Sequence, residues 1–276
     1  MAAGDLITLT YAKLIARVTG SASDTLLAAL ITAASDYARQ FCRRDLSPRQ
    51  YDELYDGSGR GFLVLRNAPL IALDTVTCGP STSNPQAFTG DSFDMTPGQA
   101  LISFKPTETA DYFYGYSVSL QFPVGVAAVR AQYAAGFGYR TSVAAAISAG
   151  NQTVTPAAMS GYTNGPWSIN SGDTLVIDSG LATEETVTVT ATSSTTFTAT
   201  FAKAHAAGAY VLGTVLPADL QFAVAQIVAN MYRRPDSTLQ SETLGKHSWE
   251  LRRKMDDVVL TPEVRATLAR YRDVMR

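Results

Sequence analysis

The spacing of apolar residues is helical at both ends of the chain and strand-like between them, so the chain must fold as a mixture of helices and strands. Residues 26–41 repeat apolar positions every three or four residues, which predicts a helix. Ser23 and Asp24 supply capping oxygens at its start, and arginines in its last turns suit the helix dipole. We expect a shorter helix within residues 9–20. The predicted apolar face of the longer helix consists of Leu26, Leu27, Leu30, Ile31, Ala34, Ala38 and Phe41.

From Tyr51 onward the pattern changes to β-strands. Runs rich in apolar and β-branched residues alternate with turn residues, of which Asp56-Gly57 is the clearest pair. The last run closes on Ala135-Gly136-Phe137-Gly138. Strands are predicted from Tyr51 to the Asp56-Gly57 turn and at residues 62–65, 69–78, 100–104 and 126–133.

Residues 141–215 have a different composition, crowded with Thr, Ser, Ala and Gly and poor in charge. Their β-branched runs, separated by turn residues, predict a small all-β domain, either Ig-like or a small sandwich. Low-complexity disorder is the alternative that this composition leaves open. The expected strands contain residues 174–177, 186–192, 194–201 and 209–212. The expected core consists of Trp167, Leu175, Ile177, Val187, Val189, Phe197 and Phe201.

Helical spacing returns after Pro217. One helix is predicted from Asp219 to the residues before Pro235, which cannot continue it. A second, short helix starts at Thr261-Pro262-Glu263, which combines a hydroxyl cap, a first-turn proline and a carboxylate near the dipole. An apolar stripe at a chain end is expected to need a partner surface. That stripe is Val264, Leu268, Tyr271 and Val274.

Composition excludes several classes of protein. The 276 residues are 46% hydrophobic and carry a net charge of −2, so neither a disordered chain nor a strongly basic nucleic-acid binder is expected. No apolar run reaches about 18 residues, and no signal peptide is recognised at the N-terminus. Cys42 and Cys78 are the only cysteines, and we expect two reduced thiols, one on an apolar helix face, in a chain that folds in the cytosol.

A search for catalytic patterns finds none, so we expect no enzyme, no metal and no cofactor. His205 and His247 are not spaced with other ligands as a metal site requires, and are interpreted as solvated or core-edge histidines. The glycines between Gly57 and Gly61 lack the Lys-Ser/Thr pair of a phosphate loop and precede a strand. They are interpreted as a hairpin turn.

Three basic stretches are open to two interpretations. Each, at residues 39–44, 233–234 and 252–254, is either a solvated helix end or a surface for an acidic protein or passing DNA. Trp249 stands close to the last one, and Trp with Arg is enriched at the centres of protein interfaces. The stretch at residues 252–254 is therefore the best candidate for partner binding.

The order of these motifs resembles the head–tail adaptor (connector) family of tailed phages. The resemblance is carried by the helix at residues 27–44 and by Tyr51-Asp-Glu-Leu-Tyr-Asp-Gly-Ser-Gly with the strand after it. It continues in Tyr133-Ala-Ala-Gly-Phe-Gly, in the helix that begins at Leu216-Pro-Ala-Asp-Leu, and in Glu242-Thr-Leu-Gly-Lys-His-Ser-Trp. In that family the strand near Gly136 leads almost directly into the Leu-Pro-x-Asp-Leu helix.

The resemblance implies an α+β fold. A helical adaptor scaffold with a small antiparallel sheet would span residues 1–140 and 216–276, and residues 141–215 would be an inserted all-β domain. Within the scaffold, residues 236–276 would form the segment that docks on the portal.

The resemblance also implies a structural virion protein at the head–tail interface, assembled in the host cytoplasm. Copies of the chain would form a ring, typically of twelve, beneath the portal protein and above head-closure or tail proteins. Genomic DNA would pass through the ring without sequence-specific contact. The residues expected to bind the portal or a neighbouring subunit are Trp249, Arg252, Arg253, Lys254, Val264, Leu268 and Tyr271.

Two other functions compete with the adaptor. One is another ring or tube component, such as a head-closure or tail-completion protein. The other belongs to a different class, an adhesive or glycan-binding module formed by the Thr-rich β domain. That function requires exposed aromatic side chains, and the sequence offers Tyr162, Trp167 and Tyr210.

Overall fold

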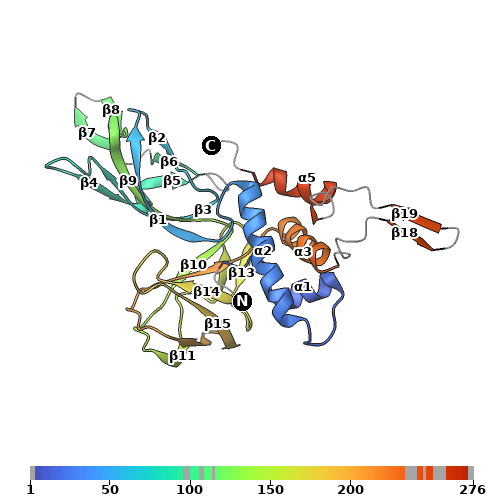
Figure 1. The fold of residues 1–276 in the computed structure, drawn as a ribbon. Coiled ribbons are helices and arrows are strands. Elements are labelled where there is room, and N and C mark those ends of the chain that lie inside the picture. Colours follow the sequence, from blue (N-terminus) through green and yellow to red (C-terminus); the bar gives the residue numbers. More distant parts are fainter. Residues whose placement is uncertain are drawn as a thin grey trace. The chain divides into compact units, whose positions relative to one another are not determined.

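The fold mixes helices and antiparallel sheets, as the apolar spacing predicted (Figure 1). The computed structural model describes residues 4–95, 100–105, 109–113, 116–233, 241–244, 247–250 and 259–272. The chain divides into two compact units. The helical unit combines Met1–Leu46 with Leu216–Arg276, and the β unit is Ser47–Val215.

Among the described residues, the helical unit contains α1 (Leu9–Ala16), α2 (Asp24–Cys42), α3 (Ala218–Tyr232) and α5 (Pro262–Arg270), which come from both ends of the chain. The buried face of α2 is shifted from the predicted one, because Leu26 is 54% exposed whereas Ser35 and Cys42 are buried. Ser35 is tolerated there because its hydroxyl accepts a hydrogen bond from the backbone N–H of Leu6 at 3.0 Å. The buried apolar side chains of α2 and α3 include Leu27, Ile31, Ala34, Ala38, Leu220, Val224, Ile227 and Val228.

One helix cap predicted from the sequence is confirmed, and another is not formed. Thr261 caps α5, accepting a hydrogen bond from the N–H of Val264 at 3.4 Å. Ser23 does not cap α2, since its hydroxyl lies 3.0 Å from the hydroxyl of Tyr232 on α3. The Asp24 carboxylate forms an ion pair with Lys13 of α1 at 2.6 Å. Both side chains therefore tie α2 to a neighbouring helix.

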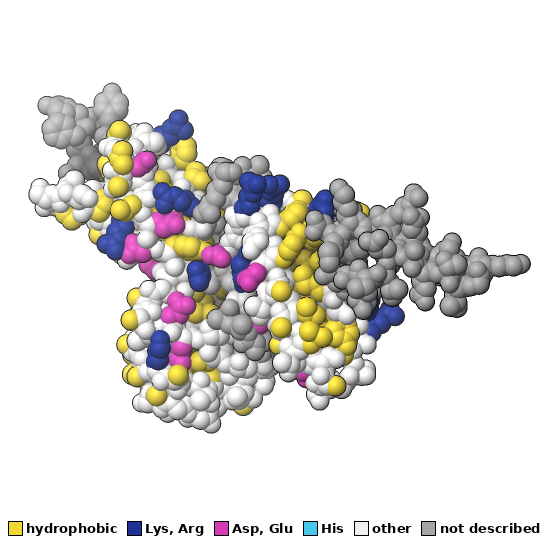
Figure 2. All heavy atoms as spheres, in the orientation of Figure 1, with side chains coloured by type: hydrophobic (Ala, Val, Ile, Leu, Met, Phe, Trp, Pro, Cys, Tyr) yellow, Lys and Arg dark blue, Asp and Glu magenta, His cyan; other side chains and the backbone are white. Residues whose placement is uncertain are grey.

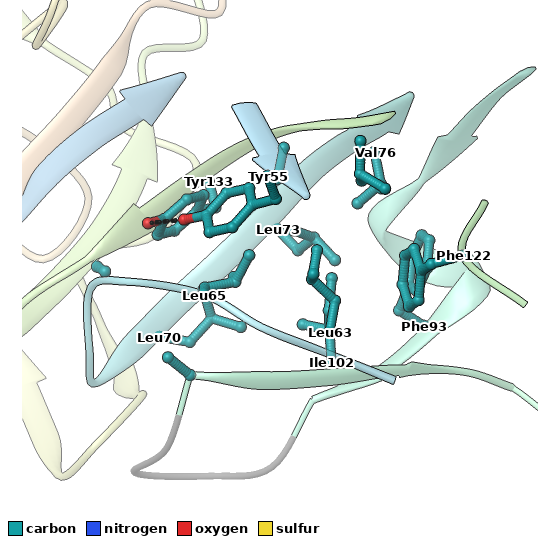
Figure 3. Packing of buried hydrophobic residues seen from close by; sticks show 14 residues of the cluster. Tyr55, Leu63, Leu65, Leu70, Leu73, Val76, Phe93, Ile102, Phe122 and Tyr133 are labelled. Carbon is teal, nitrogen blue, oxygen red and sulfur yellow. Dashed lines mark hydrogen bonds between the residues drawn. The ribbon is translucent and has the colours of Figure 1, made fainter. Parts of the chain in front are cut away.

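The first part of the β unit contains two small antiparallel sheets around one core. One sheet has the order β1 (Arg49–Gly57), β9 (Gly125–Ala135), β3 (Leu70–Cys78) and β4 (Gln86–Thr89). The other has the order β2 (Phe62–Val64), β6 (Leu101–Phe104) and β5 (Phe93–Met95). The predicted strands are confirmed, whereas the short strands β4 and β5 and the hairpin of β7 (Thr109–Phe113) and β8 (Tyr116–Ser119) were not anticipated. Figure 3 shows the apolar side chains that pack between these strands.

A hydroxyl pair lies in this core. The hydroxyls of Tyr55 and Tyr133 are 2.8 Å apart (Figure 3). Tyr133 also donates to Glu53 Oε2 at 2.8 Å and accepts from Asn67 Nδ2 at 2.9 Å. Burial raises the pKa of Tyr55 to about 12 and raises that of Tyr133 further, with the carboxylate of Glu53 contributing to both shifts. Both phenols therefore stay neutral, and their hydrogen bonds fix β1 and β9 to the turn that carries Asn67.

Six strands form the second part of the β unit. Their order is β10 (Gly138–Ser142), β17 (Tyr210–Thr214), β14 (Thr174–Ile177), β15 (Glu185–Thr192), β16 (Phe197–Phe201) and β11 (Gly150–Val154). Just beyond β10 and β11 the first and last strands meet, because Val143 pairs with Pro156 and Ala144 N–H donates to Thr155 O at 2.9 Å. The structure thus shows one six-stranded sheet whose end strands are bridged just beyond β10 and β11, where the sequence suggested an Ig-like or sandwich form.

The core of this sheet is the predicted one. Leu175, Ile177, Val187, Val189, Phe197 and Phe201 are buried in one cluster. Trp167, in the short strand β13 (Pro166–Ser168) paired with β12 (Ser160–Tyr162), packs against that cluster and stacks on Tyr139 at a centroid distance of 4.1 Å. The expected boundary at residue 141 falls inside β10, and the origin of residues 141–215 as an insertion stays a prediction.

The stack of Trp167 on Tyr139 depends on the absence of a side chain at Gly213. A Cβ atom at Gly213 would overlap the ring and hydroxyl of Tyr139. We therefore expect Gly213→Ala to lower the free energy of unfolding of the β unit by about 1–3 kcal/mol, as overpacked cores do. Denaturant titration followed by Trp fluorescence measures this.

Gly61→Ala is the matched control, since a Cβ there would lie at an ordinary 3.7 Å from Leu120 O. Its effect should stay within about 0.5 kcal/mol. Equal effects of the two substitutions would show that the Tyr139–Trp167 stack does not depend on this close approach.

Candidate functional site

The residues predicted to bind a partner cluster on and before α5, and the structure gives them different environments. Val264 is 1% exposed and Leu268 is 0% exposed. Trp249 lies in β19 (His247–Glu250), opposite Glu242 of β18 (Ser241–Leu244), and its side chain is outside the described residues. Arg252, Arg253 and Lys254 are also outside the described residues.

The chain itself covers the apolar stripe of α5. The thiol of Cys42 at the end of α2 donates to Leu268 O at 3.5 Å. Asn230 Nδ2 of α3 donates to Val259 O, just before α5, at 3.2 Å. The expectation that this stripe needs a foreign surface is therefore corrected for Val264 and Leu268, because α2 and α3 supply the surface. A partner-binding role for Val264 or Leu268 remains a prediction, and neither side chain is exposed.

Asp219, in the first turn of α3, fixes the far end of α5. Tyr271 donates its hydroxyl to Asp219 Oδ1 at 2.6 Å, and Arg270 Nη1 lies 3.7 Å from Oδ2. Burial and, to a smaller extent, the hydrogen bond to the Asp219 carboxylate together raise the pKa of Tyr271 to about 12. The hydroxyl of Tyr271 thus binds a residue of its own chain, and the predicted contact of Tyr271 with a partner remains a prediction.

The exposed face of α5 is polar and basic. Glu263, Arg265, Ala266, Ala269 and Arg270 are exposed. Over residues 251–276 the sequence carries seven Lys and Arg against four Asp and Glu, in a chain whose net charge is −2. A basic segment of this kind favours an acidic partner surface. The sequence analysis missed Arg265 and Arg270, although their positions off the apolar stripe of α5 already mark them as exposed.

In the view of Figure 2, hydrophobic side chains gather over the helical unit, whereas acidic and basic side chains are interspersed on the β unit. Three large apolar residues of the helices are exposed, namely Leu14, Leu26 and Phe222. Exposed apolar side chains mark contact surfaces when they gather into a patch. The β unit exposes large apolar side chains as well, among them Val124, Val126 and Leu181, so exposed apolar residues by themselves do not select one unit for contacts between protein subunits.

His205 forms the most distinctive polar cluster of the β unit. Its Nδ1 lies 2.7 Å from Asp178 Oδ2 and its Nε2 lies 2.6 Å from Glu185 Oε1. The imidazole is 0% exposed, so the predicted solvated or core-edge histidine is in fact buried. Sequence reasoning missed this cluster because its carboxylates lie 20 and 27 residues away.

This cluster does not have the geometry of a catalytic or metal site. Both ring nitrogens are engaged by carboxylates and no face of the ring is accessible to a substrate. The carboxylates bind opposite nitrogens, so the groups do not converge on one point. Among the residues that the structure describes, no other His, Cys, Asp and Glu side chains gather as metal ligands do. Within the same residues, no helix combines the length and apolar character needed to span a membrane.

The two thiols are unreactive by environment. Cys42 is on the buried face of α2, as predicted, and burial raises its pKa to about 11. Burial also raises the pKa of Cys78. Thiolates are therefore scarce at neutral pH, and nucleophilic chemistry at either cysteine is disfavoured.

The aromatic residues required by a glycan-binding module are mostly engaged. One face of Trp167 stacks on Tyr139, and a Cβ at Gly161 would lie 2.8 Å from its ring, so backbone lies close to Trp167 as well. Arg140 lies over the ring of Tyr210 at 4.2 Å. Tyr162 is 79% exposed, but a single tyrosine is no stacking platform for a sugar. The geometry does not favour this function.

The burial of α5 makes a quantitative prediction. Leu268→Ala should lower the free energy of unfolding of the helical unit by about 2–5 kcal/mol, because it leaves a cavity between α5 and its neighbours. The loss of helical circular dichroism with denaturant measures the change.

Leu26→Ala is the control, because Leu26 belongs to the same unit but is half exposed. It should change stability by no more than about 0.5 kcal/mol. If Leu268→Ala were equally mild, α5 would not be part of this core.

One family model matches the N-terminal part of the chain. Residues 6–59 match the model of the phage gp6-like head-tail connector protein family. A chain of the solved structure described as "Neck of empty GTA particle computed with C6 symmetry" is similar, with a TM-score of 0.42 and 14% identity over 100% of this chain and 94% of that chain. No curated protein matches. The resemblance to phage head-tail connectors that the motifs indicated is thus confirmed over residues 6–59, the range that holds α1, α2 and β1.

Proposed function

We propose that the chain is a structural subunit of the head–tail connector of a tailed phage or phage-like particle. The family match over residues 6–59 carries this proposal. Those residues supply α1 and α2 of the helical unit, and α3 and α5 contribute to the same core. The sealed His205 cluster and the unreactive thiols support a structural role over an enzymatic one.

In the finer proposal, copies of the chain form a closed ring, twelve being the number that the resemblance implies. The ring lies at the head–tail interface of the virion, beneath the portal and above head-closure or tail proteins, and is assembled in the host cytoplasm. A cyclic ring requires complementary surfaces on opposite flanks of each subunit. Leu14, Leu26 and Phe222 are exposed apolar residues of the helical unit that would suit such contacts. DNA is proposed to pass without sequence-specific contact, and the net charge of −2 suits a channel that does not bind phosphates tightly.

The C-terminal segment is proposed to dock on the portal. Trp249, Arg252, Arg253 and Lys254 are its predicted anchors, and the basic character of residues 251–276 suits an acidic portal surface. Deletion of the whole segment would be a poor test, because it removes Val264 and Leu268 from the core of the helical unit. Substitution of the exposed and charged positions tests the docking without that damage.

A head-closure or tail-completion protein is the remaining alternative within the structural class. It differs from the adaptor in its partner, since it binds below the connector and not the portal. Purified full-length chain mixed with portal from the same particle distinguishes the two. We expect rings in negative-stain images that stack coaxially on portal rings; rings that never associate with portal would contradict the adaptor function.

Charge reversal tests the docking segment. Arg252→Glu combined with Arg253→Glu should weaken portal binding at least tenfold, or about 1.4 kcal/mol. The effect should grow at low salt, where charge attraction is least screened. Biolayer interferometry on immobilised portal measures it.

Arg60→Glu combined with Lys105→Glu is the matched control, with the same charge change in the β unit. This variant should bind portal as the natural chain does. Equal losses in the two double variants would indicate a general charge effect and would contradict docking through residues 252–254.

A further inference from the structure

Two loops of the six-stranded sheet are joined by the His205 cluster. Asp178 and Glu185 stand at the two ends of the loop between β14 and β15, and His205 lies in the loop between β16 and β17. The backbone N–H of His205 donates to Ile147 O at 2.9 Å, and its carbonyl accepts from Ile147 N–H at the same distance. The imidazole ring packs edge-on against Phe201 at 5.8 Å. The backbone pair with Ile147 and the contact with Phe201 therefore hold the ring in place independently of the hydrogen bonds of its nitrogens.

The position of the imidazole between two carboxylates favours its doubly protonated form. An ionised carboxylate only accepts hydrogen bonds, so each nitrogen that faces one must carry a hydrogen. Glu185 is held ionised by further donors, since Ala202 N–H lies 2.8 Å from its Oε2 and Lys203 N–H lies 3.3 Å from its Oε1. Asp178 Oδ2 also accepts from Thr183 Oγ1 at 2.9 Å. The buried cluster thus has one positive and two negative charges.

Loss of the ring proton would leave one carboxylate without a donor. The neutral imidazole keeps a single N–H, so one short contact becomes a repulsion between lone pairs, and the cluster changes from one net negative charge to two. The only other cation that the described contacts place at this loop is Lys203, whose ammonium donates to the carbonyls of Ala182 and Glu184 at 3.0 and 2.9 Å. Glu184 itself accepts from Gly180 N–H at 2.6 Å and adds negative charge nearby.

We propose that His205 is a proton-dependent clamp that fastens the loop between β14 and β15 to the loop between β16 and β17, and that loss of its proton releases both loops. Asp178 has a left-handed backbone (φ 53°), which the clamp helps to hold. The adjacent Ser179 accepts a hydrogen bond from Gln50 N–H of β1 at 3.4 Å. Release of the loop would therefore also loosen this contact between the six-stranded sheet and the sheet that contains β1.

The direction of the pH dependence follows from the two shifted groups. Burial lowers the pKa of His205, but hydrogen bonds to Asp178 and Glu185 outweigh burial and raise it above its ordinary 6.5. Burial raises the pKa of Glu185, but hydrogen bonds from His205 and from two backbone N–H groups lower it below its ordinary 4.5. The cluster therefore stabilises the folded protein fully between pH 4.5 and pH 6.5, the ordinary pKa values of the two groups. As the pH rises above 6.5, this contribution to the free energy of unfolding decreases until the pH passes the raised pKa of His205 in the folded state.

Hydrogen–deuterium exchange of the full-length chain tests the clamp. Peptides that cover residues 178–185 and 202–208 should lose amide protection, corrected for intrinsic rates, by about tenfold per pH unit once the pH exceeds 6.5. Peptides of the helical unit should not change. In His205→Gln the same peptides should exchange faster at about pH 6 and show no such slope. A slope in the natural chain that persists in His205→Gln, or no slope in the natural chain, would overturn the proposal.

Two further measurements keep the test decisive if His205→Gln folds poorly. Thr183→Ala removes one neutral hydrogen bond to Asp178 and should reduce protection equally at every pH. Exchange of the imidazole C2 hydrogen, read separately for His205 and His247 by mass spectrometry, should give a midpoint for His205 above 6.5. A midpoint at or below 6.5 would contradict the clamp, whatever the variants do.

Discussion

Burial of α5 against α2 and α3 is the interaction on which the helical unit depends. Leu268 and Val264 complete a core whose other members lie on α3 and on α2, the latter from the N-terminal part of the chain. The two ends must therefore meet in the folded protein, with the whole β unit, residues 47–215, as the connection between them. The family match covers the first part of this arrangement, residues 6–59, and the packing of α3 and α5 explains how that part is stabilised.

The β unit reaches its stability by other means. Its first sheets surround an aromatic core with a fully hydrogen-bonded hydroxyl pair, Tyr55 and Tyr133. Its six-stranded sheet joins its own edges and encloses an apolar cluster. The ion pair of Arg140 with Asp74 at 2.7 Å, under the ring of Tyr210, links the two parts with partly buried charges. Such pairs specify an arrangement more than they stabilise it, which suits a structural protein that must present defined surfaces.

Periodicity predicted the helices, most strands and the core of the six-stranded sheet, because these depend on local patterns of burial. Residues such as Val187 and Phe197 alternate with threonines and could be assigned directly to the core. The edge closure at Val143 and Pro156 and the His205 cluster could not be predicted, since both join residues that are distant in sequence without a repeating pattern. The burial of Val264 and Leu268 by other helices of the same chain could not be predicted either, because the apolar stripe of α5 does not show which surface covers it.

We propose that this chain is a connector subunit whose helical unit makes the contacts at the head–tail interface. Electron cryomicroscopy of the particle that carries the chain would show where the subunit lies. We expect a ring of this fold between the portal and the tail, with α1, α2, α3 and α5 at the contacts between subunits and with the portal. Density for the chain elsewhere, on the capsid surface or along the tail, would contradict the assignment, and so would a ring held together by the β unit alone.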